Sequence, residues 1–228
     1  MPNIDLITLA GIPGVNQAAM VQANPNSCGA YALVAAVGAF GIFPLKAVLS
    51  YADAGPQIVN NQSVTAILDD YHQLSAAVYT VTGILSDQMP PIPVVPELLV
   101  AGNAYNSPAA MAKVAMDLGR VAPQINVQAA GFLHLNAIYP NERARCIAVV
   151  GGGNVNVAAG AYAAPGLNQT HIVCVQVVGG GLHWVAQGSN GDFYDPADGS
   201  TNNNWAPVNT GDAMGLGYTF SGLWMVIN

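Results

Sequence analysis

The sequence predicts an α+β protein, in which a helical N-terminal lobe packs on a C-terminal lobe of antiparallel strands. Segments with helical periodicity and capping residues occur mainly in the first half of the chain. Short segments rich in β-branched and aromatic residues, each bounded by Gly, Asn or Pro, occur mainly in the second half. Because 228 residues can bury one sizeable core, we expect one domain over 1–228, with lobes of about 20–125 and about 126–228.

Two helices are predicted in the first part of the chain. Residues 28–41 follow Ser27, a suitable N-cap, and are apolar nearly all round, which predicts a buried central helix. Residues 63–75 place apolar residues at amphipathic helical spacing, with Ser63 as a possible N-cap. The helical lobe is therefore expected to be organised around the more apolar of the two.

A third helix is predicted at 107–119, because Ser107 can cap its first turn, a proline fits its first position and Gly119 ends it. Four prolines between Pro90 and Pro96 come before this helix. Proline interrupts helix interiors, so this stretch is expected to be an extended connector.

The second half of the chain predicts antiparallel strands. Each expected strand joins β-branched or aromatic residues between turn-forming residues. The segments are RCIAVVGG (145–152), THIVCVQVVGG (170–180), GLHWVAQG (181–188), DFYDP (192–196) and LWMVIN (223–228).

The composition argues against several classes of partner. The formal net charge is −7, with only 5 Lys and Arg residues, which disfavours binding to nucleic acid or anionic membranes. Every apolar run is interrupted before the about 20 residues that a transmembrane helix needs, so no membrane insertion is expected. The N-terminus lacks the basic start of a secretory signal peptide. We therefore expect a cytoplasmic protein, or one exported by a specialised route without such a peptide.

The three cysteines are Cys28, Cys146 and Cys174, and they form no Cys-x-x-Cys pair, which argues against a structural zinc site. An odd number of cysteines without a signal peptide indicates free thiols in a reducing compartment. Cys146 and Cys174 lie in apolar, strand-like runs, and we expect both to be small buried core residues. Cys28 differs, because it lies at the junction of a polar loop and an apolar helix.

A cysteine in the first turn of a helix suits nucleophilic chemistry. Unpaired backbone N–H groups and the positive end of the helix dipole favour a thiolate, which is the reactive form. Gln22 lies six residues upstream and can place an amide N–H beside the backbone N–H of Cys28, where both can bind an oxyanion. The simpler alternatives are that Cys28 is one of many buried cysteines at helix starts and Gln22 an ordinary polar loop residue.

A nucleophilic thiol needs a base, and His183 is the best placed of the four histidines. It follows Gly179–Gly181, which lets backbone or substrate approach closely, and it begins a strand-like segment. The other three have simpler explanations. We expect His72 to be a solvated helix residue, and His134 and His171 to be half-buried residues in apolar runs.

The segment after this strand supplies a carboxylate at Asp195, which can fix the imidazole tautomer and stabilise imidazolium. A three-residue turn at Ser189–Gly191 pairs Asp195 with Val185 and puts it on the face of His183. A two-residue turn puts it on the opposite face, and Asp198 is then the rival.

Together these motifs resemble the papain-like cysteine peptidase superfamily, with most likeness to bacterial members such as double-glycine leader peptidases and effector-type enzymes. The resemblance rests on the pattern Q-x5-C-G-x-Y-A-L that opens the central helix, followed far downstream by H-W-V and then Y-D-P. It covers about residues 20–42 and 170–228. It implies a papain-like fold with four site residues: the nucleophile Cys28, the base His183, the orienting carboxylate Asp195 and the oxyanion donor Gln22.

The chemistry that the resemblance implies is acyl transfer on peptide amides, by a cysteine peptidase acting on a protein or peptide substrate. It needs no metal or organic cofactor. A glutamine deamidase or transglutaminase-like effector would use the same triad. A non-enzymatic protein-binding module is the other alternative, and it predicts that Cys28 is buried and unreactive and that His183 lies far from it.

Overall fold

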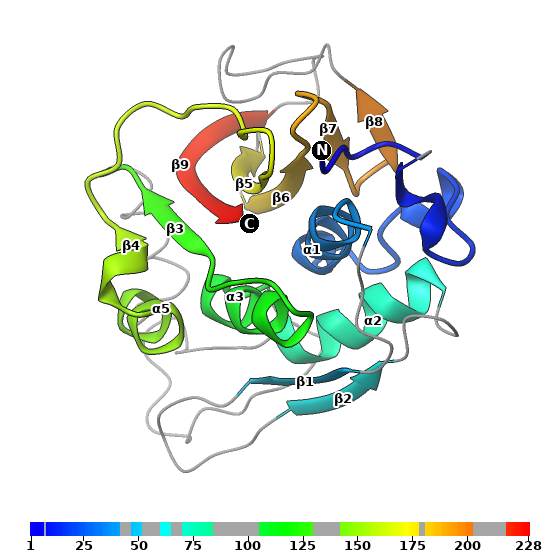
Figure 1. The fold of residues 1–228 in the computed structure, drawn as a ribbon, viewed down its shortest axis with the longest axis horizontal. Helices are drawn as coiled ribbons and strands as arrows, with labels where there is room; N and C mark the ends of the chain where they lie inside the picture. The colour runs from blue at the N-terminus through cyan, green and yellow to red at the C-terminus, as the bar shows by residue number, and fades with distance from the viewer. Residues whose placement is uncertain are drawn as a thin grey trace.

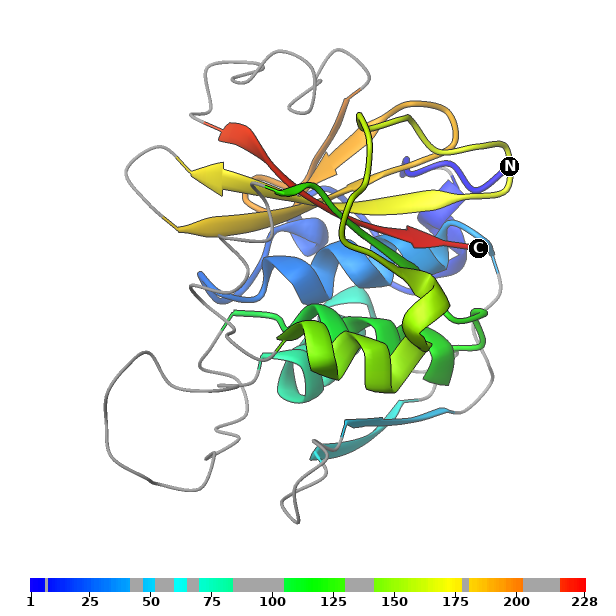
Figure 2. The same cartoon turned by 90° about the vertical axis from the view of Figure 1, so that its left-hand side faces the viewer.

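The computed structural model describes residues 1–6, 8–41, 47–51, 60–64, 70–83, 105–129, 142–177, 181–202 and 218–228. These residues form an α+β fold with four α-helices, a sheet of seven strands and a sheet of two. The views in Figures 1 and 2 show the seven-stranded sheet, then helix α1, then a layer of three helices, and finally the two-stranded sheet. The predicted α+β class is confirmed.

Helix α1 (Cys28–Gly38) is the buried central helix that the sequence predicts. All its residues are buried, because the large sheet covers one side while α2 (Tyr71–Thr82) and α3 (Pro108–Asp117) pack on the other. An apolar helix needs such cover all round. The helix is shorter than the predicted 28–41, since Ala39 is its C-cap and Gly41 turns the chain with φ of 69°.

The helix predicted at 63–75 is wrong in its start. Ser63 belongs to β2 (Asn60–Val64), which pairs antiparallel with β1 (Ala47–Tyr51), so Ser63 caps no helix. Helix α2 begins after Asp70, whose side chain accepts from the backbone N–H of Gln73 in a reciprocal capping box. This stronger start signal and an apolar stripe that continues past residue 75 place the helix further along the chain.

Helix α3 confirms the prediction at 107–119. The Ser107 side chain accepts from the N–H of Ala110, a proline occupies the first turn, and Gly119 follows with φ of 88°. The proline-rich stretch 90–96, predicted to be a connector, lies outside the described residues.

The strand predicted at 145–152 is wrong, because residues Glu142–Val150 form helix α5. The segment looks strand-like for its β-branched residues, but its burial follows a helical period. Glu142, Arg145, Cys146 and Val150 are buried, and the residues between them lie largely toward solvent. Glu142 also accepts hydrogen bonds from Ser107 and Ala109, which ties α5 to the start of α3.

The other four predicted strands are present and antiparallel. All neighbours in the large sheet pair antiparallel except β3 and β4. In spatial order the strands are β4 (Val155–Asn156), β3 (Gln124–Val127), β9 (Tyr218–Ile227), β5 (Thr170–Val177), β6 (Leu182–Gln187), β7 (Phe193–Asp195) and β8 (Ser200–Asn202).

A bulge interrupts the pairing of β5 with β9. Cys174 pairs with Leu223, but the next residue of β5 pairs with Phe220, so Ser221 and Gly222 are extra in β9. Gly222 accommodates the bulge with φ of 85°, and the Ser221 hydroxyl donates to the carbonyl of Cys174 at 2.7 Å. The first residues of β9 therefore run at a different angle from the rest of the strand.

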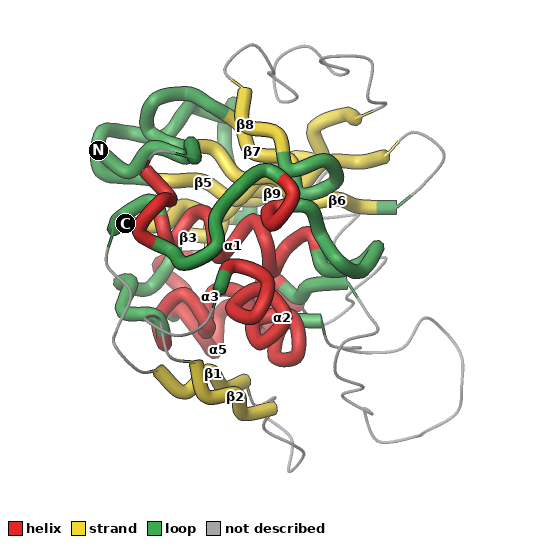
Figure 3. The backbone as a smooth tube through the Cα atoms, turned by 90° about the vertical axis from the view of Figure 1, so that its right-hand side faces the viewer, coloured by secondary structure: helices red, strands yellow, loops and turns green. Residues whose placement is uncertain are grey.

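The N-terminal segment packs against the hairpin of β6 and β7. The backbone N–H of Ser189 donates to the carbonyl of Pro2 at 3.1 Å, and the Tyr194 hydroxyl donates to the carbonyl of Met20. Both chain ends lie on the same side of the molecule (Figure 3). Among the described residues, no helix combines the length and the hydropathy that crossing a bilayer requires.

Candidate active site

Cys28 is the first residue of α1, and its side chain is only 1% exposed. Ser27 occupies the predicted N-cap position, but its hydroxyl donates to the carbonyl of Asn24 at 2.8 Å and makes no capping bond. The first backbone N–H groups of a helix have no acceptor within it. The thiol therefore lies at a helix N-terminus that Ser27 leaves uncapped.

The hairpin of β6 and β7 has the register that brings Asp195 to His183. Ala186 pairs with Tyr194 and Gln187 with Phe193, and the same register brings Asp195 opposite Val185. Gly191 allows the turn with φ of 89°, and the N–H of Gly188 donates to the carbonyl of Asp192 at 2.9 Å. The alternative register with a two-residue turn is thereby excluded.

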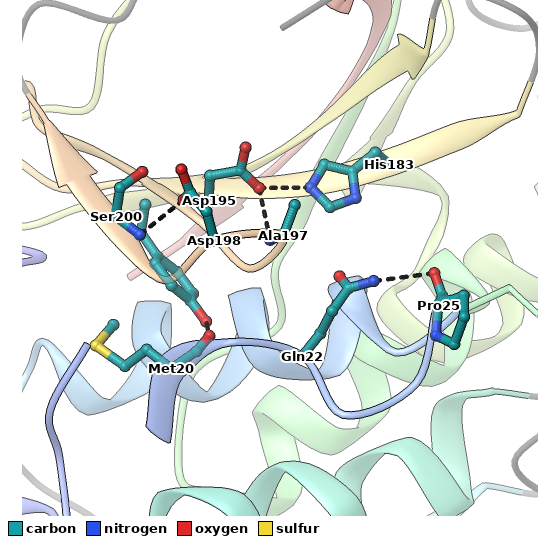
Figure 4. Close-up of polar contacts among 9 residues, drawn as sticks. Met20, Gln22, Pro25, His183, Asp195, Ala197, Asp198 and Ser200 are labelled. Carbon is teal, nitrogen blue, oxygen red and sulfur yellow. Dashed lines mark hydrogen bonds and ion pairs between the residues drawn. The ribbon is translucent and has the colours of Figure 1, made fainter. Parts of the chain in front are cut away.

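The His183 ring and the Asp195 carboxylate form a hydrogen bond of 2.7 Å between Nε2 and Oδ1 (Figure 4). Because a carboxylate only accepts, Nε2 carries the proton, and Nδ1 is left for another partner. The same Oδ1 accepts from the backbone N–H of Ala197 at 2.8 Å, which holds the carboxylate in place. His183 is 6% exposed and Asp195 is 2% exposed, so water competes little for this bond.

His183 is electrostatically coupled to both Cys28 and Asp195. Burial alone lowers the pKa of His183, but the charge of Cys28 and its hydrogen bond, together with those of Asp195, outweigh burial and raise that pKa to about 10. The thiol of Cys28 thus lies close enough to the imidazole to shift its pKa. The expectation of the binding-module alternative, that His183 lies far from Cys28, is wrong.

Gln22 lies on the loop before α1, with its side chain on the side of His183 (Figure 4). Its backbone N–H donates to the carbonyl of Pro196 at 2.8 Å, which joins this loop to the turn after Asp195. Its amide Nε2 donates to the carbonyl of Pro25 at 3.0 Å, and its Oε1 is buried with no hydrogen-bond partner among the described residues. One of the two amide N–H bonds is therefore engaged by the loop.

The rival residues are elsewhere or engaged otherwise. Asp198 is exposed and accepts from the backbone N–H of Ser200, as Figure 4 shows, so it does not replace Asp195. His72 is exposed as predicted, although its Nδ1 meets the Tyr31 hydroxyl at 2.7 Å. His134 lies outside the described residues.

The remaining histidine and cysteines are core residues. His171 is buried and lies 3.0 Å from the Tyr162 hydroxyl. Cys146 and Cys174 are buried as predicted, and burial raises the pKa of each thiol, to about 12 for Cys174. Both are therefore held as neutral thiols, which are poor nucleophiles.

Two residues near the site could not be identified from the sequence. Asn106 is fully buried, donates to the carbonyl of Asn26 at 2.7 Å, and accepts from the Thr82 hydroxyl at 2.6 Å. Tyr218 stacks on the ring of His183 from β9. Both are distant in the chain from the residues they contact, so only the fold reveals them.

In the described parts of the chain, no three His, Cys, Asp or Glu side chains lie together in a way that could hold a metal ion. The described residues instead place a buried imidazole, bonded to a carboxylate, close to the thiol at the start of α1. This arrangement, at the start of a buried helix and against an antiparallel sheet, is the one that cysteine hydrolases use.

Comparison with known protein families identifies the class. The family described as "Invasion plasmid antigen J, cysteine protease" matches residues 21–228. The chain belongs to this family and is therefore a cysteine protease, a hydrolase that uses a thiol. No curated protein and no solved structure matches the chain.

Proposed function

We propose that the protein is a papain-like cysteine peptidase whose catalytic residues are Cys28, His183, Asp195 and Gln22. Cys28 is the nucleophile, His183 is the general base and then the general acid, and Asp195 orients the imidazole. Gln22 and the backbone N–H of Cys28 bind the oxyanion. The observation that carries the proposal is the coupling of one buried imidazole to both Cys28 and Asp195.

The raised pKa of His183 supports a thiolate–imidazolium pair as the resting state. With the pKa at about 10, the imidazole holds its proton at neutral pH in spite of its burial. The proton on Nε2 is engaged by Asp195, so Nδ1 holds the proton that the Cys28 thiol gives up. Asp195 stays an acceptor throughout, and it balances the imidazolium charge.

The reaction then follows from these positions. The thiolate of Cys28 attacks the carbonyl carbon of a peptide bond, and the carbonyl oxygen takes the negative charge. The Nδ1–H of His183 gives its proton to the leaving nitrogen as the C–N bond breaks, which releases the amine and leaves a thioester. The neutral imidazole next takes a proton from water, the resulting hydroxide attacks the thioester, and the acid is released while the thiolate–imidazolium pair re-forms.

The oxyanion needs two donors, and both lie at the start of α1. The backbone N–H of Cys28 is one, because a first-turn N–H has no acceptor within the helix. The second is the amide N–H of Gln22 that does not bond Pro25. The Gln22 backbone bond to Pro196 keeps this amide beside the turn that carries Asp195.

The substrate is a protein, as the protease family implies. We further propose that the chain is a bacterial effector exported by a specialised secretion route, which agrees with the family described as an invasion plasmid antigen. The low number of basic residues, 5 in all, fits a protein surface better than a nucleic-acid partner.

Thiol labelling tests the catalytic pair. Iodoacetamide should alkylate Cys28 rapidly at about pH 6 in the native protein, since an ion-paired thiolate reacts where ordinary thiols do not. His183→Ala should abolish this fast reaction, whereas His72→Ala, at an exposed position outside the site, should leave it unchanged. Slow labelling of Cys28 in the native protein would contradict the proposal.

Peptide cleavage tests the reaction. A peptide library digested with native protein should yield shortened peptides, and Cys28→Ala should yield none, while Cys146→Ala should cleave normally. Gln22→Ala should lower turnover about 100- to 1000-fold, the cost of losing one oxyanion donor. Gln169→Ala, at a half-buried glutamine outside the site, is the matched control. Peptides of unchanged length that gain about one mass unit would identify a deamidase instead.

A further inference from the structure

Tyr218 is the first residue of β9, and its ring lies over the imidazole of His183. The ring centroids are 5.2 Å apart and the planes are inclined by 26°, so the two rings stack. The strand β9 does not pair with β6, which carries His183, because β5 lies between them. The bulge at Ser221 and Gly222 re-aims the start of β9, where Tyr218 lies.

The carboxylate of Asp195 has one oxygen in use and one without a partner. Oδ1 accepts from both His183 and the backbone N–H of Ala197. Oδ2 is buried and has no hydrogen-bond partner among the described residues. A buried carboxylate oxygen without a donor is unfavourable, so a donor close by will be drawn to it.

Tyr218 is the side chain placed to supply this donor. Burial raises the pKa of Tyr218 above its usual range, and the charge of the neighbouring Asp195 carboxylate raises it further. The hydroxyl therefore keeps its proton at neutral pH, and a negatively charged acceptor lies near it.

We propose that Tyr218 is a positioning residue for the reaction, which acts through His183 and Asp195; the inference rests on the proposed function of those two residues. Its ring restrains the imidazole from rotating away from Cys28, and an aromatic face next to the ring favours imidazolium over neutral imidazole. Its hydroxyl donates to Oδ2 of Asp195 and so fixes the plane of the carboxylate. One side chain thus restrains both partners of the 2.7 Å bond between His183 and Asp195.

The chain offers a matched control at Tyr162. Its hydroxyl lies 3.0 Å from the imidazole of His171, and the two rings have centroids 5.5 Å apart. It also donates to Gln187, so it is a partly buried tyrosine that contacts a buried histidine of the same sheet. This pair contacts neither Cys28 nor Asp195 among the interactions of the described residues, which separates general packing from an effect on the site.

The experiment measures the rate of Cys28 alkylation by iodoacetamide at about pH 6 and about pH 9 in native protein and variants. In Tyr218→Leu, the ratio of the alkylation rate at about pH 6 to the rate at about pH 9 should fall about tenfold. This is the effect expected when the ion pair is weakened by about one pKa unit. Tyr218→Phe keeps the ring and should lower this ratio by about threefold. Tyr162→Phe should leave the ratio of the two rates unchanged.

Imidazole NMR gives a second readout that packing alone does not move. In native protein the Nε2 proton of His183 should exchange slowly with water, and in Tyr218→Phe it should exchange faster while the protein stays folded. If Tyr218→Leu does not fold, Tyr218→Phe decides. Native rates and native exchange in Tyr218→Phe would overturn the inference, provided that His183→Ala abolishes fast alkylation. Fast alkylation that survives His183→Ala would overturn the proposed function itself.

Discussion

Asn106→Ala should destabilise the protein and also slow the reaction of Cys28, because Asn106 ties three segments together next to the nucleophile. Its side chain joins the carbonyl of Asn26, two residues before Cys28, to the hydroxyl of Thr82 at the end of α2. It also packs so closely on α1 that a Cβ on Gly29 would lie 2.6 Å from it.

The magnitude follows from the two hydrogen bonds, of 2.7 Å to Asn26 and 2.6 Å from Thr82. Truncation leaves a carbonyl and a buried hydroxyl without partners, and each such group costs about 1–3 kcal/mol. Thr82 is 0% exposed, so water cannot replace its lost acceptor. We expect the free energy of unfolding to fall by about 3 kcal/mol.

Urea denaturation measures this loss, and iodoacetamide alkylation of Cys28 under native conditions measures its effect on the site. Thr82→Val removes only one of the two bonds and should cost about half as much. The double variant should show a coupling energy of about 1 kcal/mol, because the two side chains share a bond. Asn154→Ala is the matched control, since Asn154 caps the end of α5 at a distance from α1.

A loss below about 1 kcal/mol for Asn106→Ala would refute this reasoning, since it would mean that the two polar groups find other partners. If Asn106→Ala is clearly destabilised but Cys28 is alkylated at the native rate, the expectation that Asn106 affects the reaction of Cys28 is refuted. The stability of the loop and the placement of the nucleophile would then be independent.

Three further outcomes follow from the structure. Burial lowers the pKa of His171 from 6.5 to about 4, so the unfolded chain binds a proton at this residue more readily than the folded protein. The free energy of unfolding should therefore fall by about 3 kcal/mol as pH drops from about 6.5 to about 4. Urea titrations of His171→Gln should not show this dependence on pH. The pKa of His183 is raised to about 10, so its contribution to the free energy of unfolding is complete below about pH 6.5 and disappears as pH rises through about 10. Peptide turnover should also decline near pH 10, because the leaving nitrogen loses its proton donor. In urea denaturation, Gly199→Ala should lower the free energy of unfolding several-fold more than Gly119→Ala. Both glycines have positive φ, which costs an alanine roughly 1–2 kcal/mol, but only at Gly199 would the new Cβ meet a carbonyl, that of Gln17 at 2.2 Å. Equal losses would show that the contact relaxes.

Local signals predicted the pieces of the candidate site that depend on neighbouring residues. A helix start can be identified from capping and periodicity, which put Cys28 at the first turn. A hairpin register can be reduced to two alternatives from its turn residues, and the structure contains the one that brings Asp195 to His183. The roles of these residues in the reaction remain predictions.

Local signals failed where two elements share one pattern. Residues 145–150 combine β-branched residues with a helical period, and the contacts of Glu142 with the start of α3 favour the helix. The start of α2 was misplaced because Ser63 and Asp70 are both acceptable N-caps, and only Asp70 has its capping box. Propensity alone does not separate such cases.

Long-range contacts of residues outside the motifs could not be predicted from one sequence. Tyr218 meets His183 only because β9 lies beside β5 with a bulge, and Asn106 meets Asn26 only because α2 and α3 pack on α1. Neither residue lies in a motif. Their positions follow from topology, which the pattern of segments leaves open.

The central place of β9 also bears on when the candidate site is complete. This strand lies between β3 and β5 and pairs along almost its whole length. Until it inserts, the sheet is divided, and His183 lacks the ring that stacks on it from Tyr218. Completion of the candidate site is therefore expected to depend on the non-local pairing of β9, and pairing of this kind is a slow step in folding.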